Sequence, residues 1–412
     1  MNTLLKKYVS KLSSQGLADE GHVILMALDD DIYSLRGASA DPGSIISSKL
    51  ERVFDKMNIN SLLYAIPSEP YRSILEGLLD REDVASEPDV IMPQDCETRT
   101  FLHDIPVINE ARSSLISNAL SSRKAAIIRQ GPAIVSYGSV SPEQAFISYS
   151  SVCFSTYVKY FFDTLNYLKS CSDTSMKPSE HILEQLRTIR SKDRKKYASI
   201  HDNSGLITGQ PADYKSERTM MIEAGRRLVT DGLVDSFFGN ISSLTNGRIM
   251  ISETSSSLDE LEEAIDEVPF DGSSSVGITA SSETSTHKRI YEKTGYDKIL
   301  HGHPRFSVVM SMYCTERCDH RGECYKDCPE ERYMSGVPIV PGEVGTGPTG
   351  IESTVPDAFK KSDAVVVYGH GVFCAGSSDF NGTMRRMTDI EEQSRTEYDR
   401  VLDELLEKCA AA

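Results

Sequence analysis

The strongest constraint on this chain is a match between its two halves. At a shift of 237 positions, Leu50–Pro67 (LERVFDKMNINSLLYAIP) aligns with His287–Pro304 (HKRIYEKTGYDKILHGHP). At a shift of 238, Ala126–Gly138 (AIIRQGPAIVSYG) aligns with Ala364–Gly376 (AVVVYGHGVFCAG). A self-match of this kind indicates an internal duplication. A chain of 412 residues also exceeds what one hydrophobic core usually organises, so we expect two domains of one fold.

The boundaries follow from changes in composition along the chain. We expect a first domain at residues 1–171 and a second at 206–412. Between them, residues 172–205 replace an apolar run with Ser, Lys, Asp and Pro, which is typical of a linker. The cysteine-rich stretch 314–328 of the second half is interpreted as an insertion.

The two halves differ at the positions that could bind a metal. The second half has one carboxylate and three imidazoles there, which are good ligands for a divalent cation. The first half has Ile46, Tyr64 and Ile66 in the places of Glu283, His301 and His303, and Pro132, or Gln130 if the loop is gapped, in the place of His370. We therefore expect the first copy to be catalytically empty.

In the second half these ligands fall at the ends of expected strands and at a helix start. His301 and His303 end an apolar strand stopped by Pro304, and residues two apart on a strand point to the same face. His370 follows a second apolar strand between two glycines, and Glu283 precedes a helical stretch. Three histidines and a glutamate suit an open zinc centre, while Mn, Co and Fe stay possible metals.

Several motifs of the second half occur together in one known family. In chain order they are FGNIS, ISETSSSLDEL, SSETSTH, HGHP and YGHG, and their first residues are Phe238, Ile251, Ser281, His301 and Tyr368. Together they cover about 170 residues of the second half. In order and spacing this set resembles the class II, metal-dependent aldolase and adducin-head family, and it is most similar to the pattern of the fuculose-phosphate aldolases. The first half resembles the same fold only through its central helix and its tail.

The resemblance implies an α/β fold: three-layer α/β/α domains with a central, largely antiparallel sheet, here as two copies in tandem. It also implies roles for individual residues. His301, His303 and His370 would hold the metal, with Glu283 as ligand and general base and Tyr333, from an adjacent subunit, as acid. The substrate phosphate would be bound by Asn240, Thr254, Ser255, Ser281 and Ser282. Ser255 stands where the family usually has glycine, which puts the conformation of this loop in doubt.

The reaction implied is an aldol cleavage or condensation of a ketose phosphate through a metal-stabilised enediolate, which makes the protein a lyase. A dehydratase or an epimerase acting on a sugar phosphate at the same metal site is the alternative enzyme. An adducin-like interaction module without catalysis is the alternative of another class. Because relatives form fourfold rings, the resemblance also implies a homo-oligomer in which two two-domain chains make a pseudo-tetramer.

Four cysteines, in the pattern C-x3-C-x5-C-x3-C, cluster in the second half. A structural zinc, an iron–sulfur cluster, and free or redox-paired thiols are the open interpretations of this cluster, because the spacing matches no specific ligand pattern. The four residues are Cys314, Cys318, Cys324 and Cys328.

Charge and hydropathy limit the partners. The formal net charge of −17 repels nucleic acid and anionic membrane surfaces, so we expect a small phosphorylated substrate and neither of those partners. The sequence contains no apolar stretch of signal-peptide or membrane-span length, and we expect a cytoplasmic protein.

Overall fold

The computed structural model forms two compact units. The first comprises Met1–Gln94 and Thr98–Ser199, and the second comprises Asp95–Glu97 and Ile200–Ala411. The structure describes residues 1–37, 45–80, 89–198, 205–235, 237–273, 278–316, 318–320, 322–343 and 347–411.

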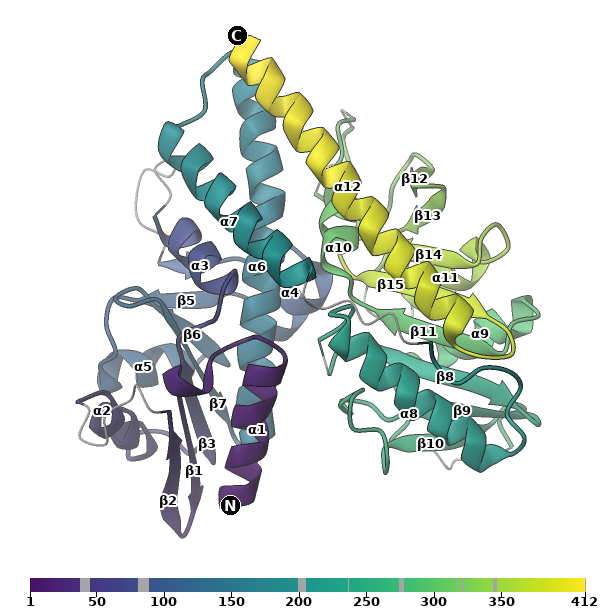
Figure 1. Ribbon diagram of the computed structural model, residues 1–412, viewed down its shortest axis with the longest axis horizontal. Helices are drawn as coiled ribbons and strands as arrows, with labels where there is room; N and C mark the ends of the chain where they lie inside the picture. Colours follow the sequence, from purple (N-terminus) through teal and green to yellow (C-terminus); the bar gives the residue numbers. More distant parts are fainter. Residues whose placement is uncertain are drawn as a thin grey trace. The chain divides into compact units, whose positions relative to one another are not determined.

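The first half of the chain alternates short strands with helices and ends in two long helices (Figure 1). Its elements are α1 (Asn2–Ser14), η1 (Glu20–His22), β1 (Val23–Asp29), β2 (Asp31–Arg36), α2 (Ile45–Phe54), β3 (Ser61–Ala65), α3 (Tyr71–Leu79), β4 (Val90–Ile91), α4 (Cys96–Leu102), β5 (Ile105–Ile108), α5 (Ser113–Leu120), β6 (Ala125–Ile128), β7 (Ala133–Gly138), α6 (Pro142–Thr174) and α7 (Glu180–Ala198).

The second half begins with a capped helix, in which the Asp213 side chain accepts from the Ser216 N–H and the Ser216 hydroxyl accepts from the Asp213 N–H. Its elements are α8 (Tyr214–Thr230), β8 (Asn240–Thr245), β9 (Arg248–Ser252), β10 (Ile265–Pro269), α9 (Thr284–Lys293), β11 (Lys298–Gly302), α10 (Arg305–Met312), β12 (Arg332–Met334), β13 (Val337–Val340), α11 (Ile351–Ala358), β14 (Ala364–Val367), β15 (Gly371–Gly376) and α12 (Asn381–Ala411).

The two sheets have the same strand order and the same strand directions. The first sheet runs β2-β1-β3-β7-β6-β5-β4, and the second runs β10-β9-β8-β11-β15-β14-β13-β12, with β10 as an additional edge strand. In each sheet one neighbouring pair is parallel, β5 with β6 and β13 with β14, and the other pairs are antiparallel. The expectation of an α/β fold with a largely antiparallel central sheet is confirmed.

The alignment of the sequence halves also preserves the strand register. Ser61 lies opposite Gly138 in the first sheet, and Lys298 lies opposite Gly376 in the second. These pairs are related by the shifts of 237 and 238 positions that align the sequences. Agreement in topology and register supports the interpretation of the chain as a tandem duplication.

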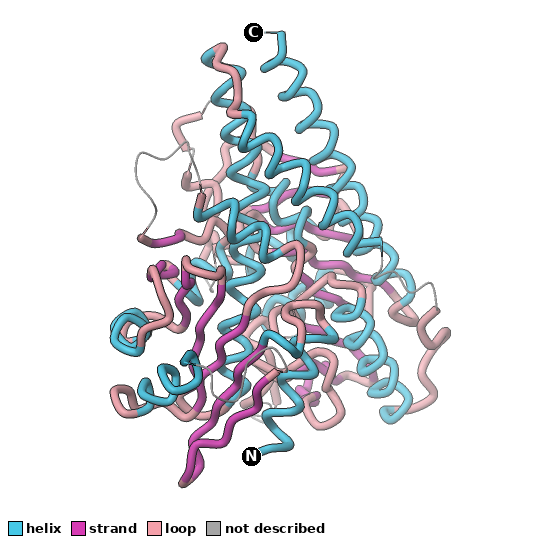
Figure 2. Tube along the Cα trace, turned by 60° about the vertical axis from the view of Figure 1, so that its left-hand side comes forward, coloured by secondary structure: helices cyan, strands magenta, loops and turns pink. Residues whose placement is uncertain are grey.

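Each sheet is covered by helices on both faces, which gives three layers (Figure 2). In the second unit, α9 and α11 pack on one face through an apolar cluster that includes Ile290 and Val355. The contacts of α8 with β8, of α10 with β14 and of α12 with β15 cover the opposite face. In the first unit, α2 and α5 lie on one face, while α1, α3 and α6 form the other layer.

In the first unit an apolar cluster occupies the place that corresponds to the ligand positions. Tyr64 and Ile66 contact this cluster, and so do Ile46 and Ile24. Ile24 lies opposite Tyr64 as Asn240 lies opposite His301 in the second sheet. Burial raises the pKa of the Tyr64 hydroxyl, so this group stays neutral. The first unit therefore has packed hydrophobic side chains where the second unit has polar groups.

Two expected boundaries are refined by the structure. Most of the expected linker, residues 172–205, is α7, which packs on α3, and residues 199–204 lie outside the described residues. Between the matched regions the second half is only one residue longer than the first, 304 to 364 against 67 to 126, so the cysteine-rich stretch 314–328 takes the place of other elements of about the same length. The first half has α3, β4 and α4 between the ends of β3 and β5, whereas the second has α10, the cysteine-rich segment and β12 between β11 and β13.

Over the part of the chain that the structure describes, no helix has both the length and the apolar character needed to cross a membrane.

Introducing histidines at Tyr64 and Ile66 tests whether these positions require apolar packing. The double variant Tyr64→His, Ile66→His is expected to lower the free energy of unfolding by about 2–4 kcal/mol, because imidazoles without partners would enter an apolar cluster. Urea denaturation followed by circular dichroism measures this, with Tyr33→His, at a 36% exposed tyrosine, as the control. A double variant as stable as the control would contradict the packing described here.

Candidate metal centre

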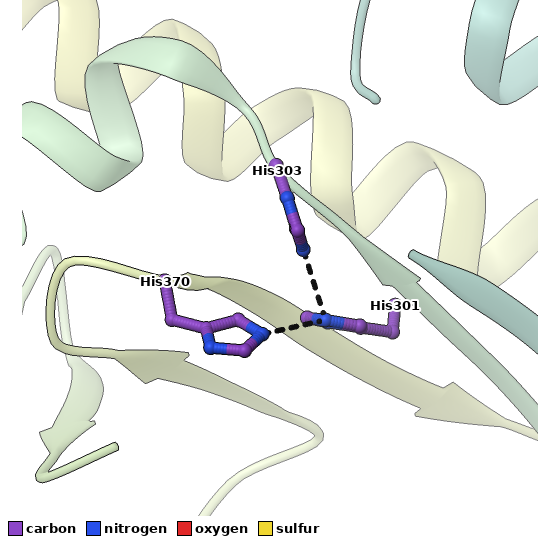
Figure 3. Close-up of side chains that lie close together, drawn as sticks. All are labelled: His301, His303 and His370. Atoms are coloured by element: carbon purple, nitrogen blue, oxygen red, sulfur yellow. Dashed lines mark hydrogen bonds between the residues drawn. The ribbon is translucent and has the colours of Figure 1, made fainter. Parts of the chain in front are cut away.

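Three buried histidines bring their Nε2 atoms together at the ends of strands (Figure 3). The Nε2 of His301 lies 3.1 Å from that of His303 and 3.3 Å from that of His370. Each side chain is at most 3% exposed. Among the His, Cys, Asp and Glu side chains of the described residues, these three form the group whose possible ligand atoms all lie within 4.8 Å of one another.

The hydrogen bonding of His301 fixes the direction of its lone pair. Its Nδ1 lies 3.1 Å from the carbonyl oxygen of Val372, so Nδ1 carries the proton and donates it. Its Nε2 then offers one lone pair, which cannot accept from both His303 and His370. Tetrahedral zinc with bonds of about 2.0–2.1 Å holds neighbouring ligand atoms about 3.3–3.4 Å apart. The three nitrogens therefore fit ligands of one divalent cation.

Burial keeps the imidazoles neutral, as metal ligands must be. Removal from water lowers the pKa of His301 to about 3 and that of His370 to about 4, because the charged form loses its hydration. The pKa of His303 is lowered well below its ordinary value for the same reason, with the two neighbouring histidines adding to the effect.

Glu283 lies beside the trio as its nearest carboxylate in the second half. Its Oε2 is 3.6 Å from His301 Nε2, and its Oε1 is 3.6 Å from His370 Nε2. Burial raises the pKa of Glu283, while the neighbouring His370 and a hydrogen bond from the Asn240 side chain act against this rise. That bond joins Asn240 Nδ2 to Glu283 Oε2 at 2.7 Å. Asn240 orients the carboxylate through this bond, and its expected role in binding phosphate stays a prediction.

Cross-strand neighbours set the orientation of His301. Asn240 on β8 and Phe373 on β15 lie opposite it in the two adjacent strands. The Phe373 ring stacks on the imidazole at 3.9 Å between centroids and 11° between planes. Behind this ring lies His287, which meets Phe373 edge-on and is bonded to the Ser242 hydroxyl at 2.6 Å. His287 thus supports the ring that packs on His301.

Two backbone features place His303 and His370. His303 donates its N–H to the Leu233 carbonyl, and α10 begins directly after it at Arg305. The N–H groups of the first turn of α10 donate to the buried Glu391 carboxylate, which holds this turn on α12. His370 lies in the turn between β14 and β15, where Gly369 has a positive φ of 57°.

The expected phosphate-binding residues come from two segments that lie side by side. The Thr254 N–H donates to the Thr279 carbonyl, and the Ser281 N–H donates to the Ser252 carbonyl. Ser255 has a positive φ of 58°, so the loop keeps the left-handed conformation without a glycine, contrary to the doubt raised by the sequence. The Ser281 hydroxyl accepts from the Glu283 N–H and Ser282 is exposed.

Two other expected groups lie outside the cluster of three histidines, and their roles stay predictions. Tyr333 on β12 is 50% exposed, and its hydroxyl donates to Glu331. The four clustered cysteines are described and are not disulfide-bonded, and no three of them bring their sulfurs within 4.8 Å of one another. Cys324 is buried and donates to the His320 carbonyl. A second metal at these cysteines stays a prediction.

One acidic residue near the trio was missed by sequence reasoning. Glu97 Oε2 lies 3.4 Å from His370 Nε2, within the second compact unit. Burial raises the pKa of Glu97 to about 8, and the charges of Glu283 and Asp95 add to this rise. Glu97 lies outside every motif and outside the aligned repeats, so no sequence signal identified it.

Comparison with known proteins identifies one family model in the second half of the chain. Residues 219–398 match the family model of the Class II Aldolase and Adducin N-terminal domain. The second half of the chain therefore contains a domain of the class II aldolase and adducin family, as the motifs predicted. No curated protein matches the chain.

Solved structures of the same family are similar to about half of the chain. L-fuculose-1-phosphate aldolase from Thermus thermophilus is 24% identical, with 45% of this chain and 96% of that protein covered at a TM-score of 0.36. A sugar-phosphate aldolase from Thermotoga maritima is 20% identical, with 46% and 97% covered at a TM-score of 0.34.

Gly371 provides a test of the close packing at the trio. A Cβ atom there would lie 2.4 Å from the Gly302 carbonyl oxygen and 2.6 Å from Cδ2 of His303. We expect Gly371→Ala to separate β11 from β15 and to weaken Zn²⁺ binding by about tenfold or more. Chelator competition measures the affinity, with Gly295→Ala, where a Cβ meets nothing within 4 Å, as the control. Equal affinities in the two variants would contradict this account.

Proposed function

We propose that the second unit is a divalent-metal-dependent aldolase that cleaves or forms a small ketose phosphate. The observation that carries the proposal is the convergence of three neutral imidazoles with one carboxylate, in a domain of the class II aldolase and adducin family. His301, His303 and His370 would hold the cation. A cation held there supplies a Lewis acid for the carbonyl and neighbouring hydroxyl oxygens of the substrate.

Glu283 is positioned to move the proton that the reaction requires. In the condensation direction a base must remove a proton from the carbon next to the carbonyl, and in cleavage the same proton returns to that carbon. Burial raises the pKa of Glu283, whereas a cation bound at the histidines would lower it, so Glu283 would act as the base once its carboxylate is not bound to the cation. Asn240 restrains one carboxylate oxygen, so the other is the oxygen available for the transfer.

The paired segments around Thr254 and Ser281 are proposed as the phosphate subsite. They end beside the start of α9, where the helix dipole favours an anion. Ser282 is exposed and Ser255 offers a backbone turn of the kind that presents N–H groups to a phosphate. The Ser281 hydroxyl is already bonded to the Glu283 N–H, so its contribution would be to hold the base and the subsite together.

The variant Glu283→Gln tests the proposal. It keeps the size and the hydrogen-bonding shape of the side chain and removes its ability to accept the proton. We expect kcat for aldol cleavage of the best substrate in a panel of ketose 1-phosphates to fall by about 100- to 10,000-fold. Release of the aldehyde product, coupled to a reductase, gives the rate.

The control is Glu292→Gln, at an exposed glutamate on the same helix, which should keep the wild-type rate. The same panel is assayed for loss of water and for change of stereochemistry, because dehydration and epimerisation are the alternative reactions of such a site. A Glu283→Gln variant that cleaves its substrate at the wild-type rate contradicts the role of Glu283. Turnover by dehydration or epimerisation alone would replace the aldolase proposal with one of these reactions.

A further inference from the structure

A segment from the first half of the sequence packs against the turn that carries His370. The Cys96 N–H donates to the Gly369 carbonyl at 2.6 Å, and the Cys96 thiol donates to the Tyr368 carbonyl at 3.5 Å. Asp95, one residue earlier, is fully buried. Asp95–Glu97 accordingly belongs to the second compact unit, although 272 positions separate Cys96 from Tyr368 in the chain.

This packing brings a second carboxylate to the metal centre. Glu97 Oε2 lies 3.4 Å from His370 Nε2, and Glu283 Oε1 lies 3.6 Å from the same nitrogen. The 3.4 Å separation from His370 is that of two neighbouring ligands on one zinc ion with bonds of about 2.0–2.1 Å, while the group of described ligand atoms that lie within 4.8 Å of one another contains the three histidines and not Glu97. His370 is the residue shared by both carboxylates.

Two carboxylates face the same imidazole nitrogen. Among the described residues, the ion pairs of Glu97 and Glu283 join them to His301 and His370 and to no lysine or arginine. A divalent cation beside them would supply the positive charge that two neighbouring carboxylates need in a buried site.

We propose that Glu97 is a further ligand of the metal centre, so that its carboxylate binds the divalent cation together with the three histidines, beside Glu283. This inference rests on the proposed function, and it extends the site beyond the four residues that the motifs predicted. The Glu97 side chain is 24% exposed, whereas those of the three histidines are at most 3% exposed. The Glu97 side chain is therefore more exposed to solvent than the three imidazoles.

The position of Glu97 also gives the first half of the sequence a function in the site. The first sheet lacks ligands of its own, and its corresponding positions are packed with apolar side chains. The start of α4, which belongs to the first half of the sequence, contributes the Glu97 carboxylate to the second unit. A chain without this segment would then bind the metal with one carboxylate fewer.

Metal affinity and the spectrum of bound Co²⁺ test the proposal without an activity assay. Full-length protein is stripped with a chelator, titrated with Co²⁺ while visible absorption is recorded, and then titrated with Zn²⁺ in competition with a chelator. The variants are Glu97→Gln, which removes the charge, Glu97→Asp, which keeps it on a shorter side chain, and Glu407→Gln, at an exposed glutamate of α12, as the control.

We expect Glu97→Gln to weaken Zn²⁺ binding by about 10- to 100-fold and to change the Co²⁺ absorption bands. Glu97→Asp should recover part of the affinity, and Glu407→Gln should match the wild type. Glu97→Gln with wild-type affinity and spectrum would overturn the assignment of Glu97, and so would an equal loss in Glu97→Asp and Glu97→Gln. A wild type that binds no Co²⁺ would instead contradict the metal centre itself, so the two failures are distinguishable.

Discussion

The convergence of three imidazole lone pairs on one point is the constraint on which the rest of the second unit depends. His301 Nδ1 is bonded to the Val372 carbonyl, so its Nε2 faces His303 and His370 with a single lone pair. Without a cation, this one lone pair would have to accept from two neighbours, which is costly at a buried nitrogen. The neighbouring groups, from the stacked Phe373 ring to the hydrogen bond between Asn240 and Glu283, hold these lone pairs in place.

The two units of this chain share one sheet topology but differ in the side chains at corresponding buried positions. The sheets share strand order, direction and register, yet one holds polar ligands where the other holds a packed apolar cluster. Apolar packing stabilises the first unit without a cofactor, because buried aliphatic side chains need no partners. The second unit keeps groups whose burial is unfavourable unless they bind something, which is the usual mark of a functional site.

The sequence predicted the parts of the site that depend on strand periodicity and on local turns. His301 and His303 share a face because they are two residues apart, and the glycine before His370 is required by the positive φ of Gly369. The sequence did not predict the contacts that depend on packing between distant segments. Asn240 pairs with Glu283 because the β8 register places it beside His301, and no motif encodes that register. Glu97 depends on how the start of α4 packs on the Tyr368–His370 turn.

The most direct test is the metal content of the full-length chain, purified without oxygen and determined by elemental analysis, for the wild type and for His303→Ala. The account predicts that the wild type retains a divalent metal that the variant loses while the variant stays folded. A residual metal in the variant would belong to the cysteine cluster around Cys314 and Cys328. A wild-type protein in which no metal depends on His303 would contradict the metal centre and leave both units as binding modules.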